Sequence, residues 1–234
     1  MEYNSTYAEI FPFISNKDYK KDALFINAWI NSNDNPKVMD FGSGCGLHLK
    51  ELIQNRDPLD YLGVEPSKHM RTESRKIGVN NLVKSVTLVE DKDFTHIFSL
   101  YNVLNCLNHI DVFVTLDQLL SRLQAGGQFL FEIWNPETDT SQLKPTERSF
   151  DYQGSPHKLT CTPINVEENS LKLHYTIKKD NSIVCESAQH IYLHSKAMFD
   201  SICAKHTKQV NWNKGLVLKN SKASLSIVGL IYHA

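Results

Sequence analysis

The sequence predicts one α/β domain, a doubly wound sheet of seven strands that carries an antiparallel β insertion in its C-terminal third. Two observations lead to this prediction. Segments with strand and helix periodicity alternate up to Asn135, as they do in parallel α/β sheets. From about Arg148, β-patterned segments follow one another without an intervening helix. At 234 residues, the chain is within the range of one elaborated domain, residues 1–234.

The N-terminal half follows the order strand, glycine turn, helix, strand. Apolar residues at helical spacing, starting at Tyr19, predict a first helix up to about Asn31, capped by Ser15 or Asn16. Strand–turn–helix–strand is a βαβ unit, which implies a parallel pair and a right-handed crossover, so this half is Rossmann-like. The further elements expected are strand 37–41, helix 47–54, strand 61–65, helix 68–77, strands 86–89 and 96–101, a helix stopped by Gly126 and Gly127, and strand 128–134.

The C-terminal third contains the insertion and the end of the main sheet. Residues 148–193 are expected to form an antiparallel layer that covers the substrate. A helix and two late strands then complete the main sheet. The segments expected are insertion strands 158–166, 170–178 and 183–193, helix 195–206, and strands 209–212 and 224–232.

Composition and charge indicate which partners to expect. The net charge is −1, from 25 basic and 26 acidic residues without a long block of either sign, so a nucleic-acid partner is not expected. The five cysteines lack metal-site or disulfide spacing and indicate reduced thiols in a cytoplasmic protein. No secretory pattern and no apolar run of ~20 residues is present, so no membrane association is expected. We therefore expect a small-molecule partner, and a homodimer is left open.

The turn after the first expected strand is the most informative segment. Gly42, Gly44 and Gly46 allow a tight turn in which a ligand lies against bare backbone, next to the free N–H groups of a helix. Glu65 ends the next strand, 19 residues after Gly46, where a carboxylate can accept both hydroxyls of a ribose. One alternative is a tight turn without a ligand. Another is a dinucleotide-binding oxidoreductase, but Leu47 stands where that fingerprint has its third glycine.

This stretch resembles motif I of class I S-adenosylmethionine-dependent methyltransferases, and Gly63-Val64-Glu65-Pro66-Ser67 resembles their second motif. The wider chain is similar to bacterial small-molecule N-methyltransferases, notably the nucleotide-sugar N,N-dimethyltransferases. The segments that carry this wider similarity are residues 7–23, 94–107, 126–137 and 171–199. The resemblance implies S-adenosylmethionine as cofactor.

The resemblance also implies roles for individual residues at the cofactor. Asp40, Gly42 and Gly44, with Gly46 in the same motif, would surround the amino-acid end, and Glu65 would hold the ribose. Glu90 or Asp91, after the expected third strand, would lie near the adenine amine. Leu100 is expected to line the site for a different reason, because it follows the fourth strand and ligands of open α/β sheets bind beyond the strand ends. Residues 1–31 would fold over the cofactor with Tyr7 and Tyr19, although Tyr19 is alternatively the first apolar position of its helix. These cofactor residues are Tyr7, Tyr19, Asp40, Gly42, Gly44, Gly46, Glu65, Glu90, Asp91 and Leu100.

The methyl acceptor is expected at the carboxyl ends of the fourth and fifth strands. Tyr101 and Trp134 would supply aromatic walls there, and an electron-rich ring also attracts a sulfonium cation. A base could assist an amine nucleophile, and His109, Glu132, His174 or His190 could supply it. Among the histidines we favour His190, which lies on the strand that lines the acceptor pocket in the similar enzymes. The catalytic candidates are therefore His190, Tyr101 and Glu132.

The function that we expect is methyl transfer from S-adenosylmethionine to a small-molecule amine, with an amino sugar as one candidate. O- or C-methylation of a small metabolite would use the same cofactor residues. A non-catalytic binding protein on the same scaffold is a further alternative. No metal is expected, because no Asp/Glu/His cluster has the spacing of a metal site.

Overall fold

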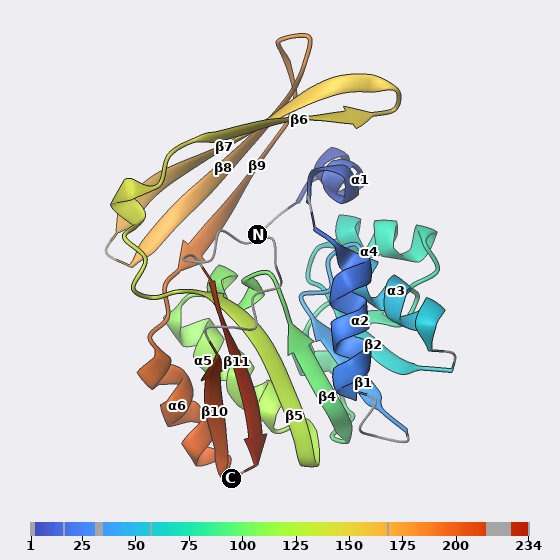
Figure 1. Ribbon diagram of the computed structural model, residues 1–234, viewed down its shortest axis with the longest axis vertical. Coiled ribbons are helices and arrows are strands. Elements are labelled where there is room, and N and C mark those ends of the chain that lie inside the picture. The colour runs from blue at the N-terminus through green and yellow to red at the C-terminus, as the bar shows by residue number, and fades with distance from the viewer. Residues whose placement is uncertain are drawn as a thin grey trace.

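The computed structural model describes residues 3–15, 17–30, 35–56, 58–167, 169–213 and 226–233. The fold has two parts. One is a seven-stranded sheet with helices on both faces, and the other is a four-stranded antiparallel sheet beyond the carboxyl ends of its parallel strands (Figure 1). The predicted fold class is therefore confirmed. Within the described ranges, no helix is both long enough and apolar enough to cross a bilayer.

The main sheet has the strand order β10-β11-β5-β4-β1-β2-β3. β1 pairs in parallel with both β2 and β4, while β11 runs antiparallel to β5. The strand order reverses between β1 and β4, and ligands of open α/β sheets bind beyond the carboxyl ends at such a point. The strands are β1 (Lys37–Phe41), β2 (Asp60–Val64), β3 (Leu82–Val83), β4 (Phe94–Ser99), β5 (Leu123–Trp134), β10 (Lys208–Asn213) and β11 (Ser226–His233).

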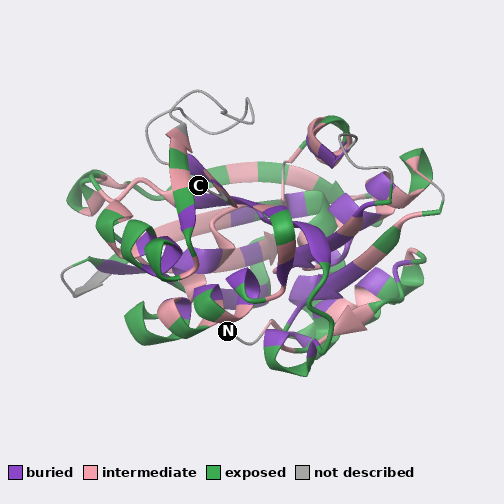
Figure 2. Cartoon of the chain, turned by 90° about the horizontal axis from the view of Figure 1, so that it is seen from below, coloured by how far each residue is buried: buried purple, intermediate pink, exposed green. Residues whose placement is uncertain are grey.

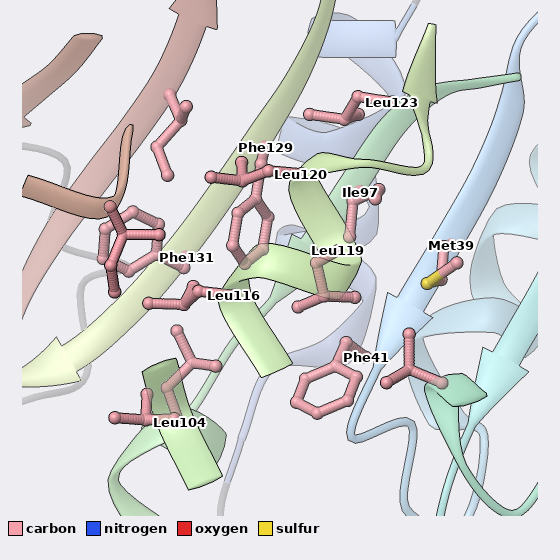
Figure 3. Close-up of a cluster of buried hydrophobic side chains, with 14 of the residues drawn as sticks. Met39, Phe41, Ile97, Leu104, Leu116, Leu119, Leu120, Leu123, Phe129 and Phe131 are labelled. Atoms are coloured by element: carbon pink, nitrogen blue, oxygen red, sulfur yellow. The ribbon is translucent and has the colours of Figure 1, made fainter. Parts of the chain in front are cut away.

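Successive side chains of each strand point to opposite faces of this sheet, and on each face they pack into an apolar cluster. Val38 packs with α2 and α3, whereas its neighbour Met39 packs with α5 and α6. Figure 3 shows Met39, Phe129 and Leu119 in the second cluster. Seen from below, the strands are largely buried and the outer helix faces exposed (Figure 2). The helices are α1 (Ser5–Ile14), α2 (Tyr19–Ile30), α3 (Leu47–Asn55), α4 (Lys68–Lys76), α5 (His109–Leu120) and α6 (Lys196–Lys205), with 3-10 turns η1 (Val86–Leu88), η2 (Val103–Cys106) and η3 (Thr140–Gln142).

The insertion is a meander in the order β6-β7-β8-β9, with antiparallel pairing throughout. Helix α1 lies between this sheet and the main layer (Figure 1) and contacts α4, β6 and β9. The Asn4 side chain caps α1 by accepting from the Tyr7 N–H, and its amide donates to the Glu186 carbonyl of β9. The strands are β6 (Thr146–Tyr152), β7 (Ser155–Glu167), β8 (Ser170–Lys179) and β9 (Ser182–Tyr192).

Several local expectations were wrong. The third strand is β3, and residues 86–89, predicted as that strand, contain the 3-10 turn η1. Helix α5 ends at Leu120, before Gly126 and Gly127, and β5 already begins at Leu123.

The N-terminal region also differs from the expectation. Helix α1 was not predicted, and Ser15 follows its last residue rather than starting the next helix. The Asp18 carboxylate accepts from the Lys21 N–H at the start of α2. The alternative cap Asn16, the expected helix end at Asn31 and the expected strand start at residue 224 lie outside the described residues.

Candidate active site

The glycine turn after β1 is fixed by its neighbours. The N–H groups of Gly42 and Ser43 both donate to the Val64 carbonyl, at 2.8 and 3.1 Å. Gly42 has φ +84°, and a Cβ on it would lie 2.3 Å from Val103 Cγ1. Gly44 has φ +54°, but a Cβ there would meet no atom within 4 Å. The turn is therefore closed by packing at Gly42 and open to a ligand at Gly44.

Glu65 follows β2 and is 5% exposed. Its Oε2 accepts from the Gly44 N–H at 3.0 Å, and its Oε1 accepts from the Ser67 N–H at 2.7 Å. Burial raises the pKa of this carboxyl group, while the two backbone N–H groups work in the opposite direction. The contacts fix the plane of the carboxylate, and each oxygen keeps capacity for a further donor.

Asp40 in β1 is a buried carboxylate with an unused oxygen. Its side chain is 2% exposed, and its Oδ2 has no hydrogen-bond partner within the described part of the chain. Burial first, and then the charge of Glu65, raise the pKa of Asp40 well above its ordinary value. Because an unsatisfied buried carboxylate is costly, this oxygen indicates a place for a cationic or N–H-bearing ligand group.

A cavity of about 520 Å³ joins these groups, which is within the range of small-molecule sites. Its floor is the carboxyl edge of β1, β2, β4 and β5, and its cover comes from the N-terminal segment and the inner face of the β6–β9 sheet. The cover contributes Tyr3, Tyr7, Phe11, Ile14, Ser15, Lys17, Tyr19, Arg148, Leu159, Leu173, Tyr175, Gln189 and Ile191.

A polar network holds Tyr101 at the end of β4. Tyr101 and the next residue both have positive φ, +59° and +63°, a costly conformation without glycine. The Tyr101 N–H donates to Glu132 Oε2 at 2.8 Å, and the Tyr101 hydroxyl donates to Asp22. The ring stacks on His48 with 5.3 Å between centroids, and Lys17 Nζ lies 3.8 Å from its centroid. The network thus places the Tyr101 side chain and the Lys17 ammonium at the cavity wall.

Comparisons with known proteins address the fold. No protein-family model matches the sequence, and no curated protein matches it by sequence. Among solved structures, DesVI of Streptomyces venezuelae has 16% identity and a TM-score of 0.77 over 100% of both chains. An S-adenosylmethionine-dependent methyltransferase of Clostridium acetobutylicum has 15% identity and a TM-score of 0.75 over 98% of both chains. CalS10 of Micromonospora echinaspora, an amino pentose methyltransferase, has 16% identity and a TM-score of 0.74 over 97% of both chains. The chain has the fold of a class I methyltransferase.

Within this methyltransferase fold, most of the predicted cofactor residues converge on the cavity. Glu132 is buried and holds the Tyr101 N–H, and it is not among the lining residues. Gly46 also lies behind the lining, where a Cβ would meet Ser74 Oγ at 2.2 Å. The predicted residues that line the cavity are Tyr7, Tyr19, Asp40, Gly42, Gly44, Glu65, Leu100, Tyr101 and Trp134.

Glu90 and Asp91 do not reach the cavity, so the expected adenine contact is wrong. Asp91 pairs with Lys37 Nζ at 3.0 Å, and Lys37 is the first residue of β1. The segment is therefore at the amino edge of the sheet, opposite the glycine turn. The error follows from the strand assignment, because the residues that come after the actual third strand are Lys84 and Ser85.

His190 does not line the cavity either, and the expectation that it faces the acceptor pocket is wrong. It is exposed, while its neighbours Gln189 and Ile191 line the cavity, because successive side chains of a strand point to opposite faces. Of the other histidine candidates, His174 lies 3.9 Å from Glu186, and His109 Nδ1 lies 3.1 Å from the His194 ring. Neither histidine is among the cavity residues.

Sequence reasoning missed several polar residues of the site, among them Lys17, His48, Arg148 and Gln189. His48 and Lys17 flank Tyr101, Gln189 Nε2 donates to Cys106 Sγ at 2.8 Å, and Arg148 enters from β6. The alternation of side chains along β9 would have indicated Gln189 if the face that points to the cavity had been known. Nothing in the sequence distinguishes Lys17, which precedes α2, or His48, which lies in α3, from an ordinary surface residue.

Proposed function

We propose that this chain is an S-adenosylmethionine-dependent methyltransferase that acts on the amine of a small molecule. The observation that carries the proposal is the pair of carboxylates at the open glycine turn. Glu65 is oriented by the Gly44 and Ser67 N–H groups, and Asp40 is buried beside it with an unused oxygen. An adenosyl amino acid supplies ribose hydroxyls for the first and a positively charged end for the second.

The residues present fit this cofactor. Glu65 would hold the ribose, and Asp40 with the turn at Gly44 would hold the amino-acid end. Lys17 would pair with the cofactor carboxylate, because its ammonium lies on the Tyr101 ring and Tyr101 follows β4, the neighbour of β1. Leu100, Tyr7 and Tyr19 would provide apolar contacts from the floor and the cover. Residues 1–31 would thus cover the cofactor.

The bound cofactor supplies a methyl group on a sulfonium, which a neutral amine can attack in line. The protein's part is to align the two reactants and to exclude water. Tyr101 would form one wall of the space in which the reaction takes place. Glu132 holds its backbone N–H, and Asp22 holds its hydroxyl. The inner face of residues 148–193 would close the opposite side. Glu132 would therefore be a positioning residue.

An amine acceptor is supported by the proteins that share the fold. Their names describe CalS10 as an amino pentose methyltransferase, KedS8 as a sugar N-methyltransferase and MtfA as a glycopeptide N-methyltransferase. The cavity volume of about 520 Å³, which the cofactor would share, supports an acceptor of small size.

The test is to incubate the purified protein with S-adenosylmethionine and a panel of small amines, amino sugars included. Mass spectrometry would follow methylated products and S-adenosylhomocysteine. We expect a mass gain of one or more methyl groups on nitrogen. Turnover only with alcohols or carbon acids would contradict the amine, and absence of cofactor binding would contradict the whole proposal.

A further inference from the structure

The charged residues of the cavity are divided between its two walls. Both carboxylates, Asp40 and Glu65, lie at strand ends of the main sheet. Both permanent cations among the described lining residues, Lys17 and Arg148, belong to the cover. A positively charged cofactor suits the acidic wall, so the basic wall raises the question of what lies against it.

Lys17 already has electrostatic partners. Its ammonium lies on the Tyr101 ring, and the charges of Glu132 and Asp22 act on it. A carboxylate of the cofactor would complete this environment. The cation on Lys17 therefore needs no further explanation.

Arg148 has no carboxylate partner within the described chain, and the group whose charge acts on it is the Tyr7 phenol. It sits on the inner face of β6, opposite Leu159 of β7, and the next inward residue is Phe150. Within the described chain, no hydrogen bond, ion pair or ring contact engages its guanidinium, although the side chain is half-buried and lines the cavity. Its neighbour Glu147 faces outward and pairs with Lys158. A partly desolvated guanidinium without a counter-ion is costly unless a ligand supplies one.

We propose that Arg148 binds an oxyanion, a carboxylate or a phosphate, on the methyl acceptor. The inference rests on the proposed function and narrows its substrate class to amines that carry such an anionic group. A guanidinium offers two parallel N–H donors to a carboxylate or phosphate, which fixes the orientation of the bound molecule.

The decisive experiment is a titration of S-adenosylhomocysteine-loaded protein with phosphate and, separately, acetate at constant ionic strength. Four proteins are compared: wild type, Arg148→Gln, Arg148→Lys and the control Lys158→Gln. Lys158 is a neighbouring cation on the outer face of the same sheet. Wild type and the control should bind one of the anions saturably, Arg148→Gln about tenfold more weakly, and Arg148→Lys in between. Which anion binds distinguishes phosphate from carboxylate.

A second arm uses matched amines in the methyl-transfer assay: ethanolamine against O-phosphoethanolamine, and glycinamide against glycine. The anionic member should be preferred by about tenfold in kcat/KM, and Arg148→Gln should remove the preference. Anion binding that is absent in wild type or unchanged in Arg148→Gln would overturn the inference. A loss of S-adenosylhomocysteine affinity in Arg148→Gln without a change in anion binding would assign Arg148 to the cofactor instead. Absence of S-adenosylhomocysteine binding in wild type would contradict the proposed function itself.

Discussion

The two walls of the cavity hold their polar groups in different ways. On the strand-end wall, backbone N–H groups orient Glu65, and Glu132 holds the backbone of Tyr101. On the cover, Arg148 projects from a sheet whose inner face is otherwise mostly apolar, and no hydrogen bond or ion pair within the described chain fixes its guanidinium.

This difference indicates a division of labour. A wall that is fixed before binding suits a ligand whose shape does not vary, which is the cofactor in our proposal. A wall whose cation, Arg148, has no counter-ion in the described chain suits the methyl acceptor, which is the ligand that differs between enzymes of one fold. Substitutions at the glycine turn, at Asp40 and Glu65 and in the N-terminal part of the cover should therefore affect the cofactor, whereas substitutions on the inner face of the β6–β9 sheet should affect the acceptor.

The largest effect is expected at the glycine turn. Gly42→Ala should lower the free energy of unfolding by about 2–5 kcal/mol, because it combines a positive φ with overpacking against Val103. Gly44→Ala is the matched control, with a similar φ but open space, and should cost only about 1–2 kcal/mol while weakening cofactor binding. Urea unfolding and calorimetry would measure both. Equal stability losses would show that packing at Val103 is unimportant.

Asp40→Asn should change two quantities, the pH dependence of the free energy of unfolding and the affinity for S-adenosylmethionine. Burial and the charge of Glu65 raise the pKa of Asp40, so the folded chain binds this proton more tightly than the unfolded chain. The free energy of unfolding should then fall as pH rises from the ordinary carboxyl range toward the raised pKa. The asparagine variant should lose this part of the pH dependence and bind S-adenosylmethionine at least about tenfold more weakly. An unchanged slope in urea unfolding between pH 4 and 8 would contradict the raised pKa.

Lys17→Met should weaken cofactor binding by about tenfold and leave the melting temperature nearly unchanged. The physical reason is the loss of the ammonium above the Tyr101 ring. Lys20→Met, an exposed position on α2, is the control and should bind normally. If both variants behave alike, Lys17 does not contact the cofactor.

The smallest effects are expected on β9. Gln189→Ala should reduce kcat/KM for the acceptor about fivefold, because Gln189 lines the cavity and bonds to Cys106. His190→Ala, on the opposite face, should change it by less than about twofold. The reverse order would mean that β9 presents its other face to the substrate.

The sequence was sufficient for the layer architecture, the glycine turn and the position of Glu65, because each depends on local backbone chemistry. It failed where a short element lacked a periodic signal. The edge strand β3 has only two residues, and the mostly apolar residues 86–89 were predicted in its place. That error moved the expected adenine acid to Glu90 or Asp91, at the wrong edge of the sheet.

The sequence also did not show which face of a strand points to the cavity. Whether Gln189 or His190 faces the cavity depends on the register of β9 against β8, where Gln189 pairs with Leu173. The network of Asp22, His48 and Tyr101 joins α2, α3 and the end of β4, and no local pattern reports such a tertiary contact.

In our proposal the cavity binds S-adenosylmethionine through Glu65, whose carboxylate is oriented before binding. Isothermal titration of wild type and Glu65→Gln with S-adenosylhomocysteine, with NADH as a comparison ligand, tests it most directly. A glutamine would set an amide N–H₂ against the Gly44 or Ser67 N–H. We expect wild type to bind one S-adenosylhomocysteine per chain, the variant to bind at least about tenfold more weakly, and neither to bind NADH. Equal affinities of the two proteins, or no binding by wild type, would contradict the account.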